Sequence, residues 1–360
     1  MKKIGYRTIA QVAGVSTFTV SLALKNHSRV AIETRRKIQR IAARLGYVPN
    51  AALASVMAHT RASGQTRYQA TLAYIDASAS SHRDYYAFQT YKAGVVKRAH
   101  QLGYEVDSFI IDDLVRPPKA IERILLARGI RGMIMMWPHH QGIPPSWRQL
   151  WEKRSCVFLA ARPEFPALPV AMSDHFSVGA LAYKKAYAAG HRRISVVLDR
   201  WLHAVTEGRF MGGVYSQREL LHPAGQVPVL RIGEAEERLF LNWYKRHRPE
   251  CIITMSFGIA DYLRKARLKV PSDVSLVHWD VDPHAYGRWA GPEQHPAPIA
   301  HSAVDLLVSR IHHNTTGTAM AQTCLLTEPV WHDGASLRVA RKKLIPPRRP
   351  GPKKRISLKT

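Results

Sequence analysis

From residue 70 onwards, short apolar runs alternate with amphipathic stretches, and this alternation restricts the possible folds more than any other feature of the chain. The apolar runs include ATLAYIDA (70–77), GMIMMW (132–137) and VSLVHWD (274–280). A segment with helical periodicity, TYKAGVVKRAHQLGY (90–104), is typical of the stretches between them. Strands that alternate with helices over short connections form parallel sheets covered by helices. The pattern predicts an α/β core whose ligands bind at the carboxyl ends of the strands.

A different pattern occupies the first 48 residues. Apolar residues recur there at helical spacing in three sets: Tyr6, Ile9, Ala10 and Ala13; Val20, Ala23 and Leu24; Ile38, Ile41, Ala42 and Leu45. Gly14 separates the first two sets and Ser16 is a favourable N-cap for the second helix. Two short helices across a glycine turn, braced by a third, predict a helix-turn-helix head. The alternative is a three-helix cap with a solvated basic face.

The residues of this head closely resemble the DNA-binding head of the LacI/GalR family of transcriptional regulators. The matching positions are Ile9-Ala10, Ala13-Gly14-Val15-Ser16, Thr19-Val20-Ser21, Thr34-Arg35 and Leu45-Gly46-Tyr47-Val48-Pro49-Asn50. A looser resemblance continues through VAMSDHFSVGALAYKKAYAAGHRRISVV (170–197), VPSDVSLVHWD (270–280) and LLTEPVWHDGAS (325–336). The likeness covers residues 4–336, which is most of the chain.

The resemblance implies an all-α helix-turn-helix head plus an α/β core of two doubly wound parallel-sheet subdomains, of the periplasmic-binding-protein-like type I. The expected divisions are a head at 1–48, a hinge helix and linker at 49–63, an effector-binding and dimerisation core at 64–336, and a basic Pro-rich tail at 337–360. Within the core, the N-subdomain is expected at about 70–168 plus 298–325. The C-subdomain is expected at about 169–297 plus 326–336.

In heads of this family the second helix lies in the major groove of DNA. The resemblance implies that Thr17, Phe18 and Leu22 face the bases. Side chains expected to contact phosphates are those of Thr19, Ser21, Asn26, His27 and Arg35. Many relatives have an arginine in place of Leu22, and arginine can grip a guanine whereas leucine cannot. The sequence therefore predicts a site that depends less on guanine at that position.

A hinge segment follows Pro49. Asn50 can cap a short helix, and in the family this helix pairs with that of the second protomer in the minor groove. The resemblance implies DNA contacts for Asn50, Leu53, Val56 and Met57, with Val56 in the wedge position where leucine is usual. A simple amphipathic linker is the alternative.

Six residues of the core stand where the family binds its effector. Arg209 matches an arginine that grips hydroxyls or a carboxylate, and Asp280 matches a carboxylate that binds hydroxyls. The other four are Asp76, Tyr86, Phe88 and Trp279. Ordinary structural roles, such as a surface ion pair or a core aromatic, are the alternative for each. Ser256-Phe257 replaces a usual Asn-Asp pair, so the effector could be a sugar derivative, a less polar molecule or none.

Charge is concentrated at the two ends of the chain. The formal net charge is +27, of which residues 1–63 hold +10 and residues 341–360 hold +9. Basic segments of this kind bind polyanions. The tail is rich in Pro, Lys and Arg and is expected to add phosphate contacts. Residues 348–355 also resemble an AT-hook, although the usual Gly-Arg-Pro centre is missing.

Composition argues against several protein classes. The three cysteines (Cys156, Cys251, Cys324) lie far apart, and the chain contains no GxGxxG, GxxxxGK[ST], GxSxG or HExxH motif. We therefore expect no enzyme, no cofactor and no metal site; the pairs His139-His140 and His312-His313 are expected at the surface. No apolar run approaches a membrane span and no signal-peptide core follows the start, which favours a cytoplasmic location without membrane contact.

These features together predict a sequence-specific DNA-binding regulator, a repressor that binds a pseudo-palindromic operator as a homodimer. A small molecule in the core cleft, such as a sugar or a sugar derivative, would control it. The alternative is a cytoplasmic small-molecule-binding protein of the same core fold whose DNA binding is nonspecific. A solute-binding protein is disfavoured by the basic head, and an enzyme by the lack of a nucleophile–base pair.

Overall fold

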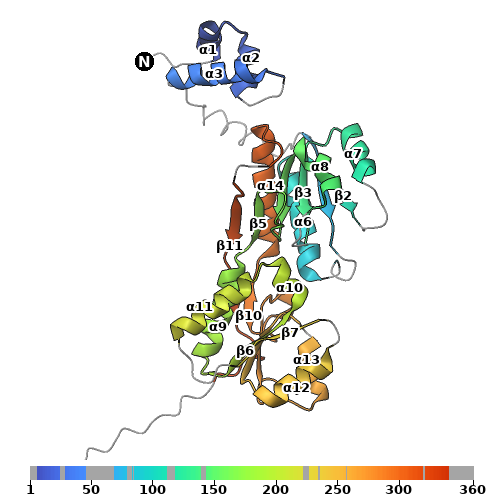
Figure 1. Cartoon of the computed structure of the whole chain (residues 1–360), viewed down its shortest axis with the longest axis vertical. Coiled ribbons are helices and arrows are strands. Elements are labelled where there is room, and N and C mark those ends of the chain that lie inside the picture. The colour runs from blue at the N-terminus through green and yellow to red at the C-terminus, as the bar shows by residue number, and fades with distance from the viewer. Residues whose placement is uncertain are drawn as a thin grey trace, which may run out of the picture.

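The computed structural model describes residues 6–24, 29–45, 69–78, 83, 85–111, 118–138, 143–221, 227–233, 236–256, 258–318 and 321–339. Within them the chain forms a small helical head and a larger α/β core of two lobes (Figure 1). A helical head followed by a core of parallel sheets is the predicted fold class, and it is confirmed. The predicted hinge helix and nearly all of the predicted tail lie outside the described residues.

The head consists of three short helices: α1 (Tyr6–Ala13), α2 (Thr17–Leu24) and α3 (Ile32–Arg44). Its core is formed by the side chains whose spacing predicted the helices, together with Val30. The fully or nearly fully buried members are Ile9, Ala10, Ala13, Val20, Ala23, Val30, Ile38 and Ala42. Periodicity thus identified the buried face of each helix correctly.

The first lobe contains a six-stranded sheet in which every neighbouring pair is parallel. Its order is β11-β5-β4-β3-β1-β2. The strands are β1 (Ala70–Asp76), β2 (Tyr104–Ile110), β3 (Gly132–Met136), β4 (Ser155–Leu159), β5 (Val170–Ser173) and β11 (Cys324–Thr327). The short strands β3, β4 and β5 are buried along their whole length, as expected for a parallel sheet covered on both faces.

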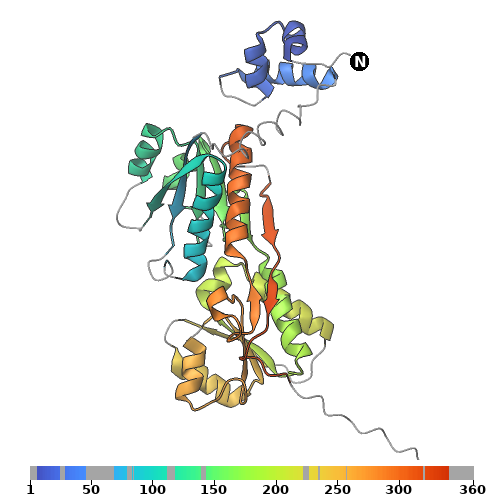
Figure 2. The ribbon, with the colours of Figure 1, turned by 180° about the vertical axis from the view of Figure 1, so that it is seen from behind.

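Helices cover both faces of this sheet. On one face α6 (Tyr86–Gln101) and the long α14 (Pro296–His312) lie side by side (Figure 2). They pack so closely that a Cβ on Gly94 of α6 would collide with Ala300 of α14. The other face is covered by α7 (Pro118–Ala127), the one-turn η1 (Pro145–Trp147) and α8 (Arg148–Glu152).

The second lobe repeats the same layering on a smaller scale. Its four parallel strands have the order β7-β6-β8-β9. They are β6 (Ile194–Asp199), β7 (Leu230–Ile232), β8 (Cys251–Thr254) and β9 (Ser275–His278). Helices α9 (His175–Ala188), α10 (Arg200–Val205) and α11 (Arg209–Leu221) cover one face. Helices α12 (Glu237–His247) and α13 (Gly258–Lys265) cover the other, and the one-turn η2 (Pro283–Ala285) follows β9.

The chain crosses between the lobes three times. It crosses after β5, again between β10 (Gly291–Glu293) and α14, and finally between β11 and β12 (Val330–His332), where β10 and β12 form an antiparallel pair. The subdomain boundaries expected at 168/169 and 325/326 are therefore a few residues early. All of β5 and β11 pair with the first sheet, because their hydrogen-bonding continues to Ser173 and Thr327.

Candidate functional site

The turn between α1 and α2 fixes the position of the second helix. Gly14 adopts a positive φ of 70°, a conformation that glycine reaches without strain, and the Val15 amide donates to the Ala10 carbonyl at 3.1 Å. The Ser16 hydroxyl then accepts the Thr19 amide at 3.0 Å. The predicted N-cap is thus present, and α2 leaves the turn in one defined direction.

The outer face of α2 is short and uncharged. Thr17 is exposed, and Phe18 has 66% of its surface accessible, which is unusual for an aromatic residue. Leu22 is half-buried because it also packs against the core of the head. The Thr19 hydroxyl lies 2.8 Å from that of Ser16 and so contributes to the cap. Thr17 and Phe18 are the two predicted base-facing side chains that are free to meet a groove.

Helix α3 braces this face from behind. The Gln39 amide donates to the Ala23 carbonyl at 3.2 Å, which ties α3 to the end of α2. Arg35, expected at a phosphate, donates through Nη2 to the Val30 carbonyl at 3.0 Å and so also holds the loop before α3. Ala31 precedes the helix and provides no side-chain cap.

Several residues predicted to contact DNA lie outside the part of the chain that the structure describes. They are Asn26, His27, Asn50, Leu53, Val56 and Met57. Ser21 lies within a described helix, but its side chain is not described. The roles of these residues remain predictions.

In the core, two predicted carboxylates end strands of different lobes. Asp76 is the last residue of β1, and its Oδ1 accepts the Ser78 amide at 2.9 Å as well as the Ser78 hydroxyl. Asp280 follows β9, and its Oδ1 accepts the Gln294 amide at 3.3 Å. Carboxyl ends of parallel strands are where α/β proteins bind ligands, so both side chains are placed as expected for a cleft.

The Asp280 carboxyl group is surrounded by protein although part of it remains accessible. Burial raises its pKa to about 7, and the nearby charges of Asp282 and Glu293 act in the same direction. Behind it, the ring of Trp279 is completely buried and stacks on Phe210 with 4.8 Å between ring centres. In this structure Trp279 forms the wall behind Asp280 and has no surface of its own to offer a ligand.

His278 supports the same wall from inside the sheet. Its Nε2 lies 2.7 Å from the Met255 carbonyl oxygen, and its Nδ1 lies 2.7 Å from the Asp280 carbonyl oxygen and 3.2 Å from the Asp280 amide. Burial lowers the pKa of His278 to about 4, so the ring is neutral at pH 7. A neutral ring places no positive charge beside Asp280.

Arg209 is the first residue of α11 and forms an ion pair with a neighbouring carboxylate. Its Nε donates to Glu207 at 3.1 Å. Glu207 also accepts hydrogen bonds from Arg162, whose Nε and Nη2 lie 2.6–3.0 Å from the carboxylate oxygens. Burial alone would raise the pKa of Glu207, but the hydrogen bonds from Arg162 and Arg209 outweigh it and hold the pKa below its usual range. Since Arg162 lies between β4 and β5, this ion pair joins the two lobes.

The two predicted aromatic residues belong to α6. Tyr86 meets His284 of η2 edge to face, with 5.8 Å between ring centres, and so forms a second contact between the lobes. Phe88 packs partly against the core of the first lobe. Tyr86 is therefore the better placed of the two to meet a ligand.

Sequence reasoning missed four residues of this region. Arg162 and Glu207 form the ion pair described above. His175 at the start of α9 is buried beside Phe210, and burial together with the charge of Arg209 lowers its pKa to about 4. Tyr91 of α6 is 7% exposed and feels the charge of Asp280. The position of His175 two residues after a buried strand was a usable signal; Tyr91 had none, because its helical spacing is that of a core residue.

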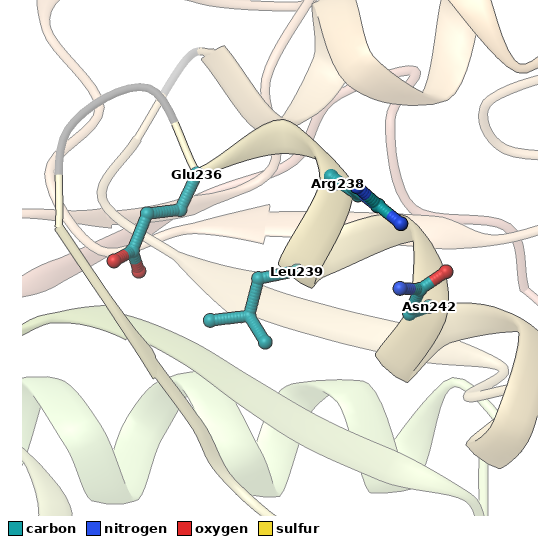
Figure 3. A pocket seen from close by; sticks show the side chains of 4 residues that line it. All are labelled: Glu236, Arg238, Leu239 and Asn242. Atoms are coloured by element: carbon teal, nitrogen blue, oxygen red, sulfur yellow. The ribbon is translucent and has the colours of Figure 1, made fainter.

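Other polar clusters give less evidence of a functional site. Figure 3 shows a shallow hollow on α12, lined by Glu236, Arg238, Leu239 and Asn242, which contains none of the predicted effector residues. His312 lies near the Tyr104 hydroxyl, and the His139-His140 pair is outside the described residues. Within the described ranges no group of three or more His, Cys, Asp or Glu residues could hold a metal ion.

Two family profiles match the chain. One, described as bacterial regulatory proteins of the lacI family, matches residues 7–50. The other, a periplasmic binding protein-like domain, matches residues 184–336. The first covers the helix-turn-helix head, and the second covers most of the second lobe with the crossings that follow it.

Curated relatives match over most of their length. The regulator MalR of Streptococcus pneumoniae serotype 4 is 24% identical over 278 residues, which cover 74% of this chain and 81% of MalR. The lactose operon repressor of Escherichia coli K12 is 26% identical, covering 78% of this chain and 76% of the repressor. The repressor PurR of Haemophilus influenzae is 23% identical, with 86% and 92% covered. These relatives are transcriptional regulators and not enzymes.

Solved structures share the fold. A complex of the transcriptional regulator CelR with cellobiose superposes with a TM-score of 0.62 at 18% identity, covering 92% of this chain and 99% of CelR. A lac repressor dimer bound to operator and the anti-inducer ONPF gives a TM-score of 0.58 at 18% identity, with 94% and 100% covered. Among the described helices of this chain, none is long and apolar enough to cross a membrane.

Proposed function

The chain is a member of the LacI family of DNA-binding transcriptional regulators, and from this premise we propose that it represses its target genes as a homodimer on a pseudo-palindromic operator. A small molecule in the cleft between the two lobes would control the affinity of the heads for that operator. The assignment as a DNA-binding transcriptional regulator rests on the family. The dimer, the operator and the effector are our proposal.

The exposed face of α2 is the observation that carries this proposal. A cap at Ser16 fixes the helix, and Thr17 and Phe18 project from it without any acidic neighbour in α1 or α2. Uncharged side chains of this kind distinguish bases by methyl contacts and hydrogen bonds, whereas phosphates alone would favour lysine and arginine. The excess of basic residues at both ends of the chain would supply affinity, and α2 would supply sequence preference.

A homodimer follows from how such heads read DNA. One α2 reaches only a few base pairs, and two heads related by a two-fold axis read two half-sites about one helical turn apart. The related lac repressor is bound to its operator as a dimer. We expect the hinge residues Asn50, Leu53, Val56 and Met57 to pair at the centre of the site, with Val56 inserted more shallowly than a leucine would be.

The effector would act by binding between the two lobes of the core. Arg209 and Asp280 lie on the second lobe, Asp76 and Tyr86 on the first, so one ligand can engage both. The Arg162–Glu207 ion pair already joins the lobes, and Glu207 also holds Arg209. A ligand that takes over Arg209 must rearrange this pair and would thereby change the population of the closed arrangement. CelR binds cellobiose, so a sugar-like molecule is the natural class.

A gel-shift titration tests the proposal against its alternative. Full-length protein is titrated onto genomic fragments at 50–200 mM salt, with excess unrelated DNA as competitor. A regulator retains at least one fragment under competition, and Phe18→Ala, at an exposed position, releases it without loss of folded protein by circular dichroism. A small-molecule-binding protein with nonspecific DNA affinity would bind every fragment alike and lose all of them to the competitor.

A further inference from the structure

The outer face of α3 carries a row of basic side chains. Arg36, Arg40 and Arg44 follow one another at intervals of four residues and are exposed, and Lys37 is exposed beside them. Residues at this spacing lie on one side of a helix, about 6 Å apart along its axis. The one acid in the sequence of α3, Glu33, stands in its first turn. The head therefore has a basic face that extends over most of α3.

This face points away from the core of the head. Ile38 and Ala42 are the buried residues of α3, and Arg40 lies two residues from each of them. Because each residue turns a helix by about 100°, Arg40 projects from the side opposite the buried pair. By the same spacing the exposed Phe18 lies opposite the buried Val20 of α2. The two helices pack against each other (Figure 1), so their outer faces point in different directions.

No ion pair within the described residues neutralises this row. Arg36, Arg40 and Arg44 form none with any acid of the described ranges, whereas Arg98 and Arg128 of the core each pair with an aspartate. The Nε of Arg40 donates to the Arg36 carbonyl at 3.4 Å, a contact along the helix itself. Like charges four residues apart destabilise a helix. A row that costs stability in the free head indicates an anionic partner.

A shallow hollow lies in this basic face. It is lined by Arg36, Gln39, Arg40 and Ala43. The Gln39 amide is held by the Ala23 carbonyl at the end of α2, so this part of the lining is fixed. Two guanidinium groups beside a hollow can hold a phosphate group, because their planar forks match its oxygens.

The backbone of duplex DNA fits the row as a whole. Each strand of a duplex offers one phosphate for about every 3.4 Å of its axis. Arginines about 6 Å apart can therefore contact successive or alternate phosphates of one strand. The duplex read by α2 lies on a different side of the head, because α2 carries no charged residue and presents Phe18 there.

We propose that the basic face of α3 binds the phosphate backbone of a second DNA duplex while α2 reads the operator. This inference rests on the proposed function, since it takes α2 to occupy the operator. It goes beyond that function by assigning each head a second DNA surface, which is independent of sequence. One protein molecule would thereby hold two duplexes together.

Capture of a second duplex by the full chain tests the proposal. A genomic fragment that the chain retains under competition is fixed to beads and loaded with protein. A fluorescent 40-base-pair duplex of unrelated sequence is then added at 50–200 mM salt. Its capture should require the protein and should fall about 40-fold over this range, as expected for three phosphate contacts.

The triple variant Arg36→Gln, Arg40→Gln, Arg44→Gln should capture at least tenfold less of the second duplex and should still bind the bead-bound fragment. Glutamine and arginine have similar helix propensities, so the thermal transition should be unchanged. Lysine at the same three positions keeps the charge and should preserve most of the capture.

The matched control removes the same charge from exposed positions of α12 in the second lobe. Arg238→Gln, Lys245→Gln, Arg246→Gln together should capture the second duplex like the wild type. An equal loss in this control, or unchanged capture by the α3 variant, would overturn the proposal.

Two further outcomes would also overturn it. An equal loss of the bead-bound fragment in the α3 variant would show that α3 contacts the operator duplex itself. Fluorescent poly-L-glutamate captured as tightly as the second duplex would show that an acidic polypeptide suits the face equally well. If no genomic fragment survives competition, the proposed function fails; an unrelated duplex then replaces the fragment on the beads, and the α3 variant is compared in the same way.

Discussion

Leu22 is predicted to determine whether one position of the operator is read through a guanine. It is half-buried, packs against the core of the head, and lies about one helical turn after the exposed Phe18 on α2. Replacing it with arginine adds a planar donor able to bind a guanine in two places, an interaction that discriminates by about 1–3 kcal/mol. Leu22→Arg is therefore expected to change the DNA selected from a random pool, with a guanine appearing in each half-site. Val12→Arg on α1, at an exposed position outside the predicted reading face, is the control and should leave the sequence unchanged.

Asp280 has a measurable effect on stability as well as on binding. Its pKa is raised from 3.8 to about 7, so between these values the folded chain binds more protons than the unfolded chain. Its contribution is then fully present below pH 4 and is lost as the pH rises through 7. Three pKa units correspond to about 4 kcal/mol, which partial solvent contact reduces to about 2 kcal/mol.

Asp280→Asn tests this effect through urea unfolding at pH 5 and pH 8. The variant should gain about 2 kcal/mol over the wild type at pH 8 relative to pH 5. A difference between the proteins that does not change with pH would show that the carboxyl group is not desolvated.

Residue-level prediction succeeded where a position is set by its own element. The N-cap at Ser16 and the exposure of Phe18 follow from local spacing alone. It failed where the role of a side chain depends on residues of the other lobe, as for Tyr91 and Arg162. Nothing in the sequence shows that those segments lie close together. Trp279 was expected to meet the ligand, but its ring is required to fill the space against Phe210.

At the scale of elements, the contact between α9 and α11 depends on glycines. A Cβ on Gly179 of α9 would overlap the Phe210 carbonyl oxygen, and one on Gly213 of α11 would overlap that of Phe176. Two helices can approach this closely only where no side chain intervenes. The contact in turn holds Phe210 under Trp279, and so positions the wall that carries Asp280.

Gly179→Ala should accordingly destabilise the core by about 2–3 kcal/mol, as overpacking of a closed interior does. Gly212→Ala is the matched control, because its Cβ would come no nearer than 3.5 Å to the Phe176 ring. Thermal unfolding followed by near-ultraviolet circular dichroism compares the two. Equal transition temperatures would contradict the close helix contact.

Most elements were recognisable from the sequence, but the lobe to which a strand belongs was less so. Buried parallel strands such as β3 and β9 are continuous apolar runs and were identified from the sequence. β5 and β11 are equally short, and assigning them to a sheet depends on pairing between residues 170 and 324, far apart in the chain. Helix α11 was not identified as a helix, since two glycines interrupt its apolar pattern.

For the whole molecule, affinity and specificity for DNA should separate. Residues 341–360 carry nine Lys and Arg and no acid, so deleting them should weaken all DNA binding and leave the preferred sequence unchanged. Each lost phosphate contact lowers the magnitude of the slope of log K against log salt by about 0.9, so the deletion should reduce it by at least about 1. Fluorescence anisotropy between 50 and 200 mM salt measures this, and an unaltered slope would exclude the tail from the DNA complex.

The central claim is that two heads of this chain read one two-fold-related site. Selection of bound DNA from a random pool by the full chain tests it most directly, followed by titration of the enriched sequence against a scrambled one at 150 mM salt. We expect two inverted half-sites about one helical turn apart, bound at least about 1,000-fold more tightly than the scrambled DNA. A pool that stays random after repeated rounds, with equal affinity for both sequences, would contradict the claim.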